Sequence, residues 1–176
     1  MKGLVLDLFA GTGSATEPFV ECGRHRVVRA DIEMRPGINF RVNAKNLPSF
    51  LLRERAEFIW ASPPCDDLTD VPWNEELREP SRGIALFQQA IEIINVMHPK
   101  KYCIENVRGA QRFVGPANMH RGSRYLWTDI DILPEVPKCY GKWRIPPSPE
   151  RKMLRSAIPG PLARAFHHVM CDGATT

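Results

Sequence analysis

Short apolar runs alternate with amphipathic stretches along this chain. A continuous apolar run is typical of a strand buried on both faces of a parallel sheet, whereas apolar residues that recur every three or four positions indicate a helix with one buried side. The runs predict strands at 4–9, 27–28, 39–42, 58–60, 102–107 and 124–132, the last as one or two strands. The recurring positions predict helices at 15–22, 48–55, 81–97 and 162–170. This alternation predicts an α/β fold with a mostly parallel sheet and helices on both faces.

The segments between these elements differ in composition. Residues 66–73 are acidic, contain a proline and are too polar to belong to the core, and loops of this kind often carry function. Ser81 is placed to cap the helix that follows them. Five prolines between residues 133 and 150 exclude much regular structure there.

A glycine turn follows the first predicted strand. Gly11 and Gly13 allow a ligand to approach the backbone closely, and the first amides of the next helix face the same place. Asp31 follows about 20 residues later, where nucleotide-binding α/β folds carry a carboxylate for ribose hydroxyls. The turn lacks the third glycine of the dinucleotide fingerprint, so a nucleoside without a pyrophosphate fits better. Asn43, after the strand at 39–42, carries an amide suited to an adenine edge.

A cysteine follows the predicted strand at 58–60, in the stretch Ala61-Ser-Pro-Pro-Cys65. The two prolines stiffen the backbone, and the end of a strand is where an open α/β sheet carries its chemistry. This thiol is a candidate nucleophile, although most cysteines are small buried hydrophobic residues. Glu105 and Asn106 end another predicted strand, and a glutamate in so apolar a run is rare unless it is paired or used in chemistry.

The composition is that of one globular domain. With 176 residues, 43% hydrophobic and 25% charged, the chain can bury one core, and we expect a single domain over 1–176. No apolar run reaches the roughly 20 residues of a membrane span and no signal peptide is recognised, so a soluble cytoplasmic protein is expected. The five cysteines include no C-x-x-C pair and imply neither a disulfide framework nor a zinc site. His167 and His168 are adjacent and would face different ways on a helix, so we expect both at the surface and no metal site.

The net charge of +4 is unevenly distributed. Residues 1–80 carry 10 basic and 13 acidic side chains, whereas residues 81–176 carry 14 and 7. Between residues 108 and 155 the basic side chains are interleaved with three aromatic residues, Trp127, Tyr140 and Trp143. The mixture suits a nucleic acid, whose phosphates attract cations and whose bases stack on aromatic rings. An ordinary solvated surface has the same charge pattern, and charge alone does not decide between the two.

Three segments resemble, in this order, the signature motifs of the DNA cytosine-5 methyltransferases: Asp7-Leu-Phe-Ala-Gly-Thr-Gly13, Ser62-Pro-Pro-Cys65 and Glu105-Asn-Val107. The resemblance covers roughly residues 4–170 and implies a Rossmann-like methyltransferase fold that binds S-adenosylmethionine. The cofactor-binding residues that it implies are Phe9, Gly11, Gly13, Asp31, Asn43, Ser62, Pro63 and Ser156. The implied catalytic residues are Cys65, Glu105 and Arg124, and the implied substrate contacts are Pro64, Asn106, Arg108 and Arg121.

The chemistry of cytosine requires the same residue types. Carbon 5 is a poor nucleophile, so a thiolate must first add to carbon 6, which is the role implied for Cys65. The addition moves electrons toward ring nitrogen 3, where the carboxyl group of Glu105 would stabilise the developing charge. A cytosine inside a duplex cannot reach such a pocket, so the resemblance implies DNA that is single-stranded or has its target base flipped out.

The chain departs from the family's pattern in three places. Asp66-Asp-Leu-Thr69 adds negative charge after the cysteine, where the family usually has an aromatic residue and a serine, and this charge should raise the pKa of the thiol. Arg155 and Ser156 stand where the family usually has glycine and asparagine, which leaves open a cofactor whose transferred carbon bears a carboxylate. A short basic, proline-rich insert at 128–155 replaces the family's large target recognition domain.

These departures leave several functions open. The first is transfer of a one-carbon group to carbon 5 of cytosine in DNA, with recognition of a short sequence. The second is the same chemistry on RNA or on a free cytosine nucleotide, which the missing recognition domain permits. The third is a non-catalytic module that binds the cofactor or DNA, which the presence of both Cys65 and Glu105 disfavours. No metal is expected, and a homodimer stays open because a second copy would extend the DNA contacts.

Overall fold

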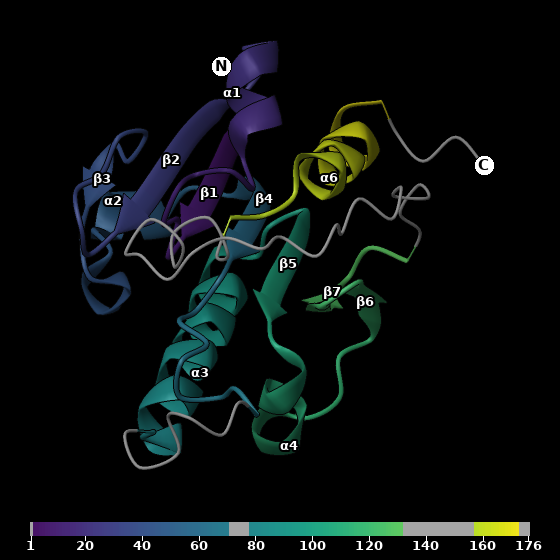
Figure 1. Ribbon diagram of the computed structural model, residues 1–176. Coiled ribbons are helices and arrows are strands. Elements are labelled where there is room, and N and C mark those ends of the chain that lie inside the picture. The colour runs from purple at the N-terminus through teal and green to yellow at the C-terminus, as the bar shows by residue number, and fades with distance from the viewer. Residues whose placement is uncertain (1, 71–77, 132–156, 173–176) are drawn as a thin grey trace.

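Seven strands form one sheet in the computed structural model of the chain, which describes residues 2–70, 78–131 and 157–172 (Figure 1). The strands are β1 (Leu4–Leu8), β2 (Arg26–Asp31), β3 (Phe40–Arg41), β4 (Ala56–Ala61), β5 (Lys101–Asn106), β6 (Met119–Arg121) and β7 (Arg124–Thr128). Their order is β3-β2-β1-β4-β5-β7-β6. Strands β1 to β5 pair in parallel, and β7 runs antiparallel to both β5 and β6. The mostly parallel sheet confirms the fold class that the apolar runs predict.

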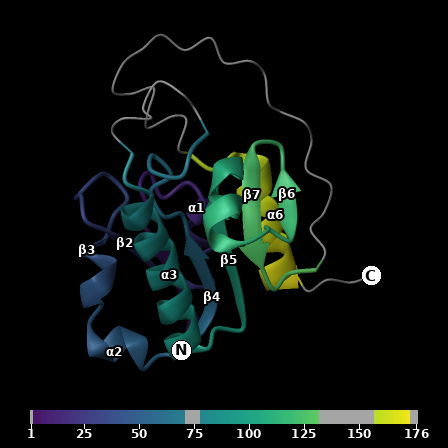
Figure 2. The same ribbon diagram turned by 90° about the horizontal axis from the view of Figure 1, so that it is seen from below.

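Helices cover both faces of the sheet (Figure 2). They are α1 (Glu17–Cys22), α2 (Ser49–Leu52), α3 (Pro80–Met97), α4 (Gln111–Val114) and α6 (Gly160–Asp172), with 3₁₀ turns η1 (Ala44–Asn46) and η3 (Arg108–Ala110). Successive side chains of a strand point to opposite faces, so β1 contributes Leu6 to the α3 side and Val5 to the α1 and α6 side. The chain therefore forms three layers, as the sequence predicts.

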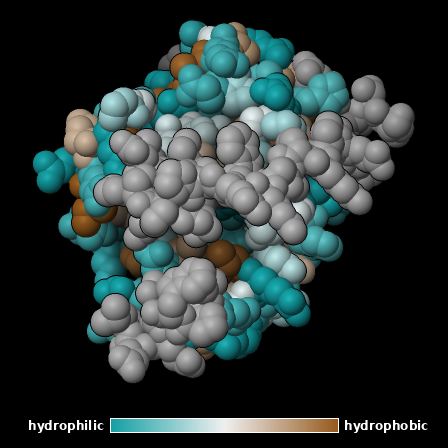
Figure 3. All heavy atoms as spheres, viewed as in Figure 1, coloured by the Kyte–Doolittle hydropathy of each residue, from teal (hydrophilic) through white to brown (hydrophobic). Residues whose placement is uncertain are grey.

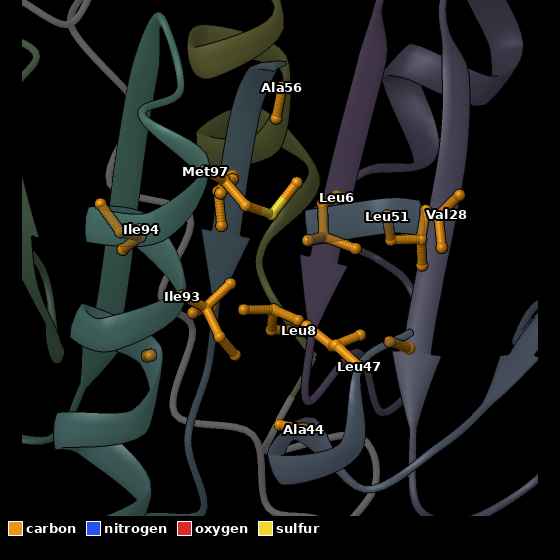
Figure 4. Packing of buried hydrophobic residues seen from close by; sticks show 14 of the residues in the cluster. Leu6, Leu8, Val28, Ala44, Leu47, Leu51, Ala56, Ile93, Ile94 and Met97 are labelled. Atoms are coloured by element: carbon orange, nitrogen blue, oxygen red, sulfur yellow. The ribbon is translucent and has the colours of Figure 1, made fainter. Parts of the chain in front are cut away.

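Two hydrophobic clusters hold these layers together. In the first, Figure 4 shows Ile93 and Met97 of α3 pointing toward Leu6 and Leu8 of β1. The second includes four fully buried aromatic residues whose ring centroids lie 5.1 to 6.5 Å apart in contacting pairs: Phe19, Phe58, Trp60 and Phe166. With these side chains inside, the face viewed in Figure 3 is largely hydrophilic outside the grey residues. Within the described residues, no helix has the length and apolar composition needed to cross a membrane.

The start of α3 corrects the predicted cap. The helix is capped at Glu79 and begins with Pro80, so Ser81 is not its cap. Asp67 accepts a hydrogen bond from the Glu79 amide at 3.1 Å and pairs with Arg82 through bonds of 2.8 and 2.9 Å. A carboxylate from the preceding loop thus performs the capping role, because it reaches the amides at the helix's first turn from outside the helix.

The acidic loop before α3 is also more buried than its composition predicts. Leu68 is fully buried and Asp67 is 4% exposed. A Cβ added at Gly83 would lie 2.7 Å from Leu68, so the missing side chain on α3 makes room for the leucine. Asp66 and Asp70 of the same loop are exposed, so the prediction from its polarity was wrong for Asp67 and Leu68 alone.

Other boundaries differ from the sequence prediction. Strand β6 was not predicted, and β7 ends at Thr128 rather than extending to 132 within the described residues. His167 is half-buried and its ring meets that of Phe19 edge-on at 5.0 Å, so it is not a surface residue, whereas His168 is exposed. Most of the insert predicted at 128–155 lies outside the described residues.

Truncation of Phe166 tests the importance of the aromatic cluster. Phe166→Ala should lower the free energy of unfolding by about 3–5 kcal/mol, because the ring is fully buried between Phe58 and Trp60. Phe50→Ala is the matched control, since Phe50 is 59% exposed and should change stability by roughly 0.5 kcal/mol or less. Urea unfolding followed by circular dichroism measures both. Equal effects of the two substitutions would contradict this account of the core.

Candidate active site

The strand order reverses between β1 and β4, which makes a topological switch point in the sheet. Chain connections leave β1 and β4 toward opposite sides of the sheet, and the two strands are neighbours. At such a switch point the loops at the carboxyl ends of the strands diverge and leave room for a ligand. The loop with Gly11 and Gly13 follows β1, and the loop with Cys65 follows β4.

The glycine loop is tied to β2 by a carboxylate. Phe9, Gly11 and Gly13 all have positive φ, at 56°, 55° and 71°. The Gly11 amide donates to Asp31 Oδ2 at 2.8 Å. A Cβ at Gly13 would lie 2.8 Å from the Arg29 side chain, so this position requires glycine for both space and conformation. Asp31 therefore shapes the loop, in addition to the ribose contact that the sequence predicts for it.

Asp7 is a further polar residue that the search for site residues missed. It is 1% exposed, and its Oδ2 accepts a hydrogen bond of 2.7 Å from Thr16, whose hydroxyl in turn accepts one from Arg29. Burial raises the pKa of Asp7 to about 7, against the opposing effects of Thr16 and Arg29. Its Oδ1 has no hydrogen-bond partner among the described residues. The sequence does contain a signal for Asp7, since it is the one charged residue in the apolar run Leu4–Leu8.

Hydrogen bonds anchor the cysteine loop on both sides. The Ser62 amide donates to Leu8 O at 3.1 Å, which joins the loop to β1, and Ser62 Oγ accepts from the Trp60 indole at 2.7 Å. On the other side, Asn106 Nδ2 donates to Pro63 O at 3.0 Å. Asn106 is 1% exposed and its Oδ1 accepts from the next backbone amide, so its amide group organises the backbone beside Cys65.

A buried ion pair lies beside this loop. Arg124 Nη1 donates to Glu105 Oε1 at 3.0 Å, and the two side chains are 16% and 6% exposed. The pairing depends on the antiparallel register of β5 and β7, which sets Glu105 opposite Leu126. Arg124 Nη2 also donates to Ala157 O at 3.1 Å and so connects the pair to the segment that leads into α6.

The environment of Cys65 raises its pKa to about 11. Burial is the largest cause, followed by the negative charges of Glu105 and Asp66, and the positive charge of Arg124 acts in the opposite direction. These electrostatic effects mean that the structure brings together Cys65, Glu105 and Arg124, the three residues for which the sequence predicts catalysis. At neutral pH the thiol of the free protein is protonated.

The remaining predicted residues lie around this centre. Asn43 is exposed and caps η1, where its Oδ1 accepts from the Lys45 amide. Arg121 pairs with Arg124 across the β6–β7 hairpin, and Arg108 is exposed in η3. Pro64 is exposed next to Cys65. Ser156 and its neighbour Arg155 lie outside the described residues.

One of the predicted stacking residues, Trp127, is partly buried and packs within the protein. The Trp127 indole donates to Gly115 O at 3.2 Å and its ring packs edge-on against Phe87, with centroids 4.9 Å apart. The side chain belongs to the core on the α3 side, because its strand turns that face inward. The other two stacking candidates, Tyr140 and Trp143, lie outside the described residues.

Comparisons with known proteins agree with the motif resemblance. Residues 4–114 match the family model described as C-5 cytosine-specific DNA methylase. A curated relative, the "Probable DNA (cytosine-5)-methyltransferase" of Frog virus 3 (isolate Goorha), is 27% identical over 170 residues, covering 81% of this chain and 77% of the relative.

Two solved methyltransferase structures are similar in part. A DNA modification methyltransferase encoded within a prophage of E. coli matches 61% of this chain with 18% identity and a TM-score of 0.46. The S. pombe Dnmt2 methyltransferase matches 62% with 22% identity and a TM-score of 0.35. The chain covers 33% and 37% of these structures, about a third of their length.

Neutralising Asp66 should make Cys65 more reactive. The thiolate is the reactive form, and a nearby negative charge raises the thiol pKa, so Asp66→Asn should lower that pKa and increase alkylation by iodoacetamide at pH 8 on the order of threefold. In the wild type the rate should still be rising at pH 10. Asp70→Asn is the control, an exposed acid that does not contribute to the shift. Peptide mass spectrometry isolates Cys65, and an unchanged rate in Asp66→Asn would refute the electrostatic account.

Proposed function

This chain belongs to the C-5 cytosine-specific DNA methylase family, and from that premise we propose that it transfers a methyl group from S-adenosylmethionine to carbon 5 of cytosine in DNA. The observation that carries the proposal is the environment of Cys65. Its thiol experiences the charges of both Glu105 and Arg124, on a loop that the buried Asn106 holds beside them. A nucleophile, a carboxyl group and a guanidinium are thereby available to one pyrimidine ring.

The residues at the ends of β1 and β2 fit a nucleoside cofactor. Among the described residues, a Cβ added at Gly11 would meet only the Phe9 carbonyl, at 3.9 Å, which leaves room for a ligand beside Asp31. S-adenosylmethionine, when bound, supplies an electrophilic methyl group. We propose cofactor contacts from Phe9, Gly11, Gly13, Asp31, Asn43, Ser62 and Pro63. No described residue favours a carboxylated cofactor.

Cys65 would act as the covalent nucleophile. Its sulfur forms a bond to carbon 6 of cytosine, and the electron pair of the 5,6 double bond moves toward ring nitrogen 3, which makes carbon 5 nucleophilic. Carbon 5 would then take the methyl group as its bond to the cofactor's sulfur breaks and S-adenosylhomocysteine leaves. Loss of the carbon 5 proton to water would expel the Cys65 thiolate and restore the ring. The thiol is unchanged over the whole cycle.

Glu105 would stabilise the charge that develops at ring nitrogen 3. Its carboxyl group is buried and held by Arg124, so little reorganisation is needed when the base enters. Engagement of Glu105 by the base also removes one of the charges that raise the pKa of Cys65. We propose that the thiolate therefore forms mainly after cytosine is bound, which protects the free enzyme from alkylation and oxidation.

The substrate would present its base outside the stack. Cys65 is partly buried and Glu105 is buried, so a cytosine paired within a duplex cannot reach them. Arg108, exposed beside the end of β5, and Arg121 are proposed to contact the DNA backbone. Pro64, exposed next to the thiol, is proposed to contact the base.

Substitution of Cys65 tests the chemistry. Cys65→Ala should abolish transfer while S-adenosylmethionine binding persists, because most of the proposed cofactor residues lie on the loops after β1 and β2 and the substitution removes only the sulfur atom. The wild type, but not this variant, should be trapped covalently by DNA containing 5-fluorocytosine, since fluorine at carbon 5 prevents the final elimination. Nucleoside mass spectrometry of DNA and RNA from expressing cells identifies the product. Turnover by Cys65→Ala, or 5-methylcytosine in RNA alone, would contradict the proposal.

Glu105→Gln tests charge stabilisation separately. The amide keeps the shape of the carboxyl group but stabilises the developing charge less well, so the single-turnover rate should fall by about 10²- to 10³-fold. Glu92→Gln, an exposed change on α3, is the matched control and should retain the wild-type rate. Thermal unfolding of both variants checks that the loss is not one of folding. A Glu105→Gln rate equal to that of the control would exclude the role.

A further inference from the structure

Two cysteines and a histidine converge where α1 and α6 pack together. Cys22 ends α1, and His167 and Cys171 lie one turn apart on α6. One ligand atom from each residue lies within 4.8 Å of the others. In the described part of the chain, no other group of three or more His, Cys, Asp or Glu side chains is close enough together to share a metal ion.

His25 lies beside the two cysteines of this group. Its Nδ1 lies 3.9 Å from Cys22 Sγ and 4.0 Å from Cys171 Sγ. Its other nitrogen, Nε2, lies 3.2 Å from Glu57 Oε2, and Glu57 is itself held by Lys100 at 2.7 Å. An imidazole that donates one N–H to a carboxylate presents the lone pair of its second nitrogen, and this is how metal-binding histidines are usually oriented.

The surroundings of the group are apolar and ordered. The fully buried Phe19 ring meets the imidazole of His25 at 5.4 Å and that of His167 at 5.0 Å, both edge-on. The His25 side chain is 8% exposed. Fixed ring orientations and restricted water access are features of a structural metal site, which is closed to substrate.

We propose that Cys22, His25, His167 and Cys171 bind one zinc ion. Two thiolates and two imidazoles form a typical tetrahedral set for this metal, and the thiolates neutralise its charge. Ideal bond lengths put sulfur and nitrogen ligands about 3.6 Å apart, so the distances of 3.9 and 4.0 Å from His25 Nδ1 to the two sulfurs need to contract by only a few tenths of an ångström. The two thiols release their protons as the ion binds.

The zinc site lies at the opposite edge of the sheet from Cys65. His25 immediately precedes β2, at the amino ends of the strands, whereas Cys65 follows a carboxyl end. The ion would therefore hold α6 against α1 and would take no part in the proposed methyl transfer. Its indirect effect is on the start of α6, where the Ile158 amide donates to Ser14 beside the glycine loop at 2.8 Å.

Metal content and cobalt spectroscopy test this site without using enzymatic activity, so the result is independent of the proposed function. The full-length chain, purified under reducing conditions and dialysed, should retain one zinc per molecule by elemental analysis. After removal of zinc, Co²⁺ should produce the visible bands of tetrahedral cobalt and a sulfur-to-cobalt charge-transfer band, which zinc then displaces.

Substitutions identify the ligands. The double variant Cys22→Ser, Cys171→Ser should lose the charge-transfer band, and His167→Gln should lose stoichiometric zinc. His168→Gln is the matched control for the histidine and Cys65→Ala for the cysteines, and both should keep one zinc. Glu57→Gln should weaken zinc affinity by about 10- to 100-fold through the orientation of His25. Circular dichroism checks that each variant is folded.

The wild-type measurements decide the matter even where a variant fails to fold. A wild-type chain without stoichiometric zinc and without a charge-transfer band in Co²⁺ would overturn the proposal. So would an undiminished band in the double cysteine variant. A disulfide between Cys22 and Cys171 in the purified chain, with no zinc bound after its reduction, would overturn it as well.

Discussion

The parallel pairing of β1, β4 and β5 is the constraint on which the rest of the site depends. Register brings Leu8 beside Ala61 and Ala61 beside Ile104, so all three strands end at the same edge. A glycine loop, a cysteine loop and a glutamate, which are far apart in the sequence, are thereby brought to one crevice. The Asn106 side chain and the Ser62 backbone amide then join the cysteine loop to its two neighbours through hydrogen bonds to backbone carbonyls.

Electrostatics gives this crevice its chemical character. The negative charges of Glu105 and Asp66 raise the pKa of the Cys65 thiol, and the positive charge of Arg124 lowers it. Asp7, on the strand below the glycine loop, also has a raised pKa through burial. A site of this kind holds its groups in their neutral or paired forms until a ligand enters, since burial of an uncompensated charge is costly.

The opposite edge of the sheet has a different role. There the packing of α6 against α1 brings Cys22 and Cys171 to the same imidazole, His25. Helix α6 lies between the two regions, since the Ile158 amide just before it donates to Ser14 and Cys171 is in its last turn.

The sequence by itself determined the features that depend on neighbouring residues. Apolar runs specified most of the strands, the glycines specified the turn after β1, and two prolines followed by Cys65 identified the candidate nucleophile. These signals are readable because backbone conformation and binary patterning act over a few residues.

Only the tertiary structure decided which distant side chains meet. The burial of Trp127 against Phe87, the capping of α3 by Asp67 and the pairing of Glu105 with Arg124 all depend on contacts between separate elements. Cys171 and His25, 146 positions apart, approach only because the last helix packs on the first. No local pattern encodes such contacts, since they arise from the shared burial of apolar surface between helices and sheet.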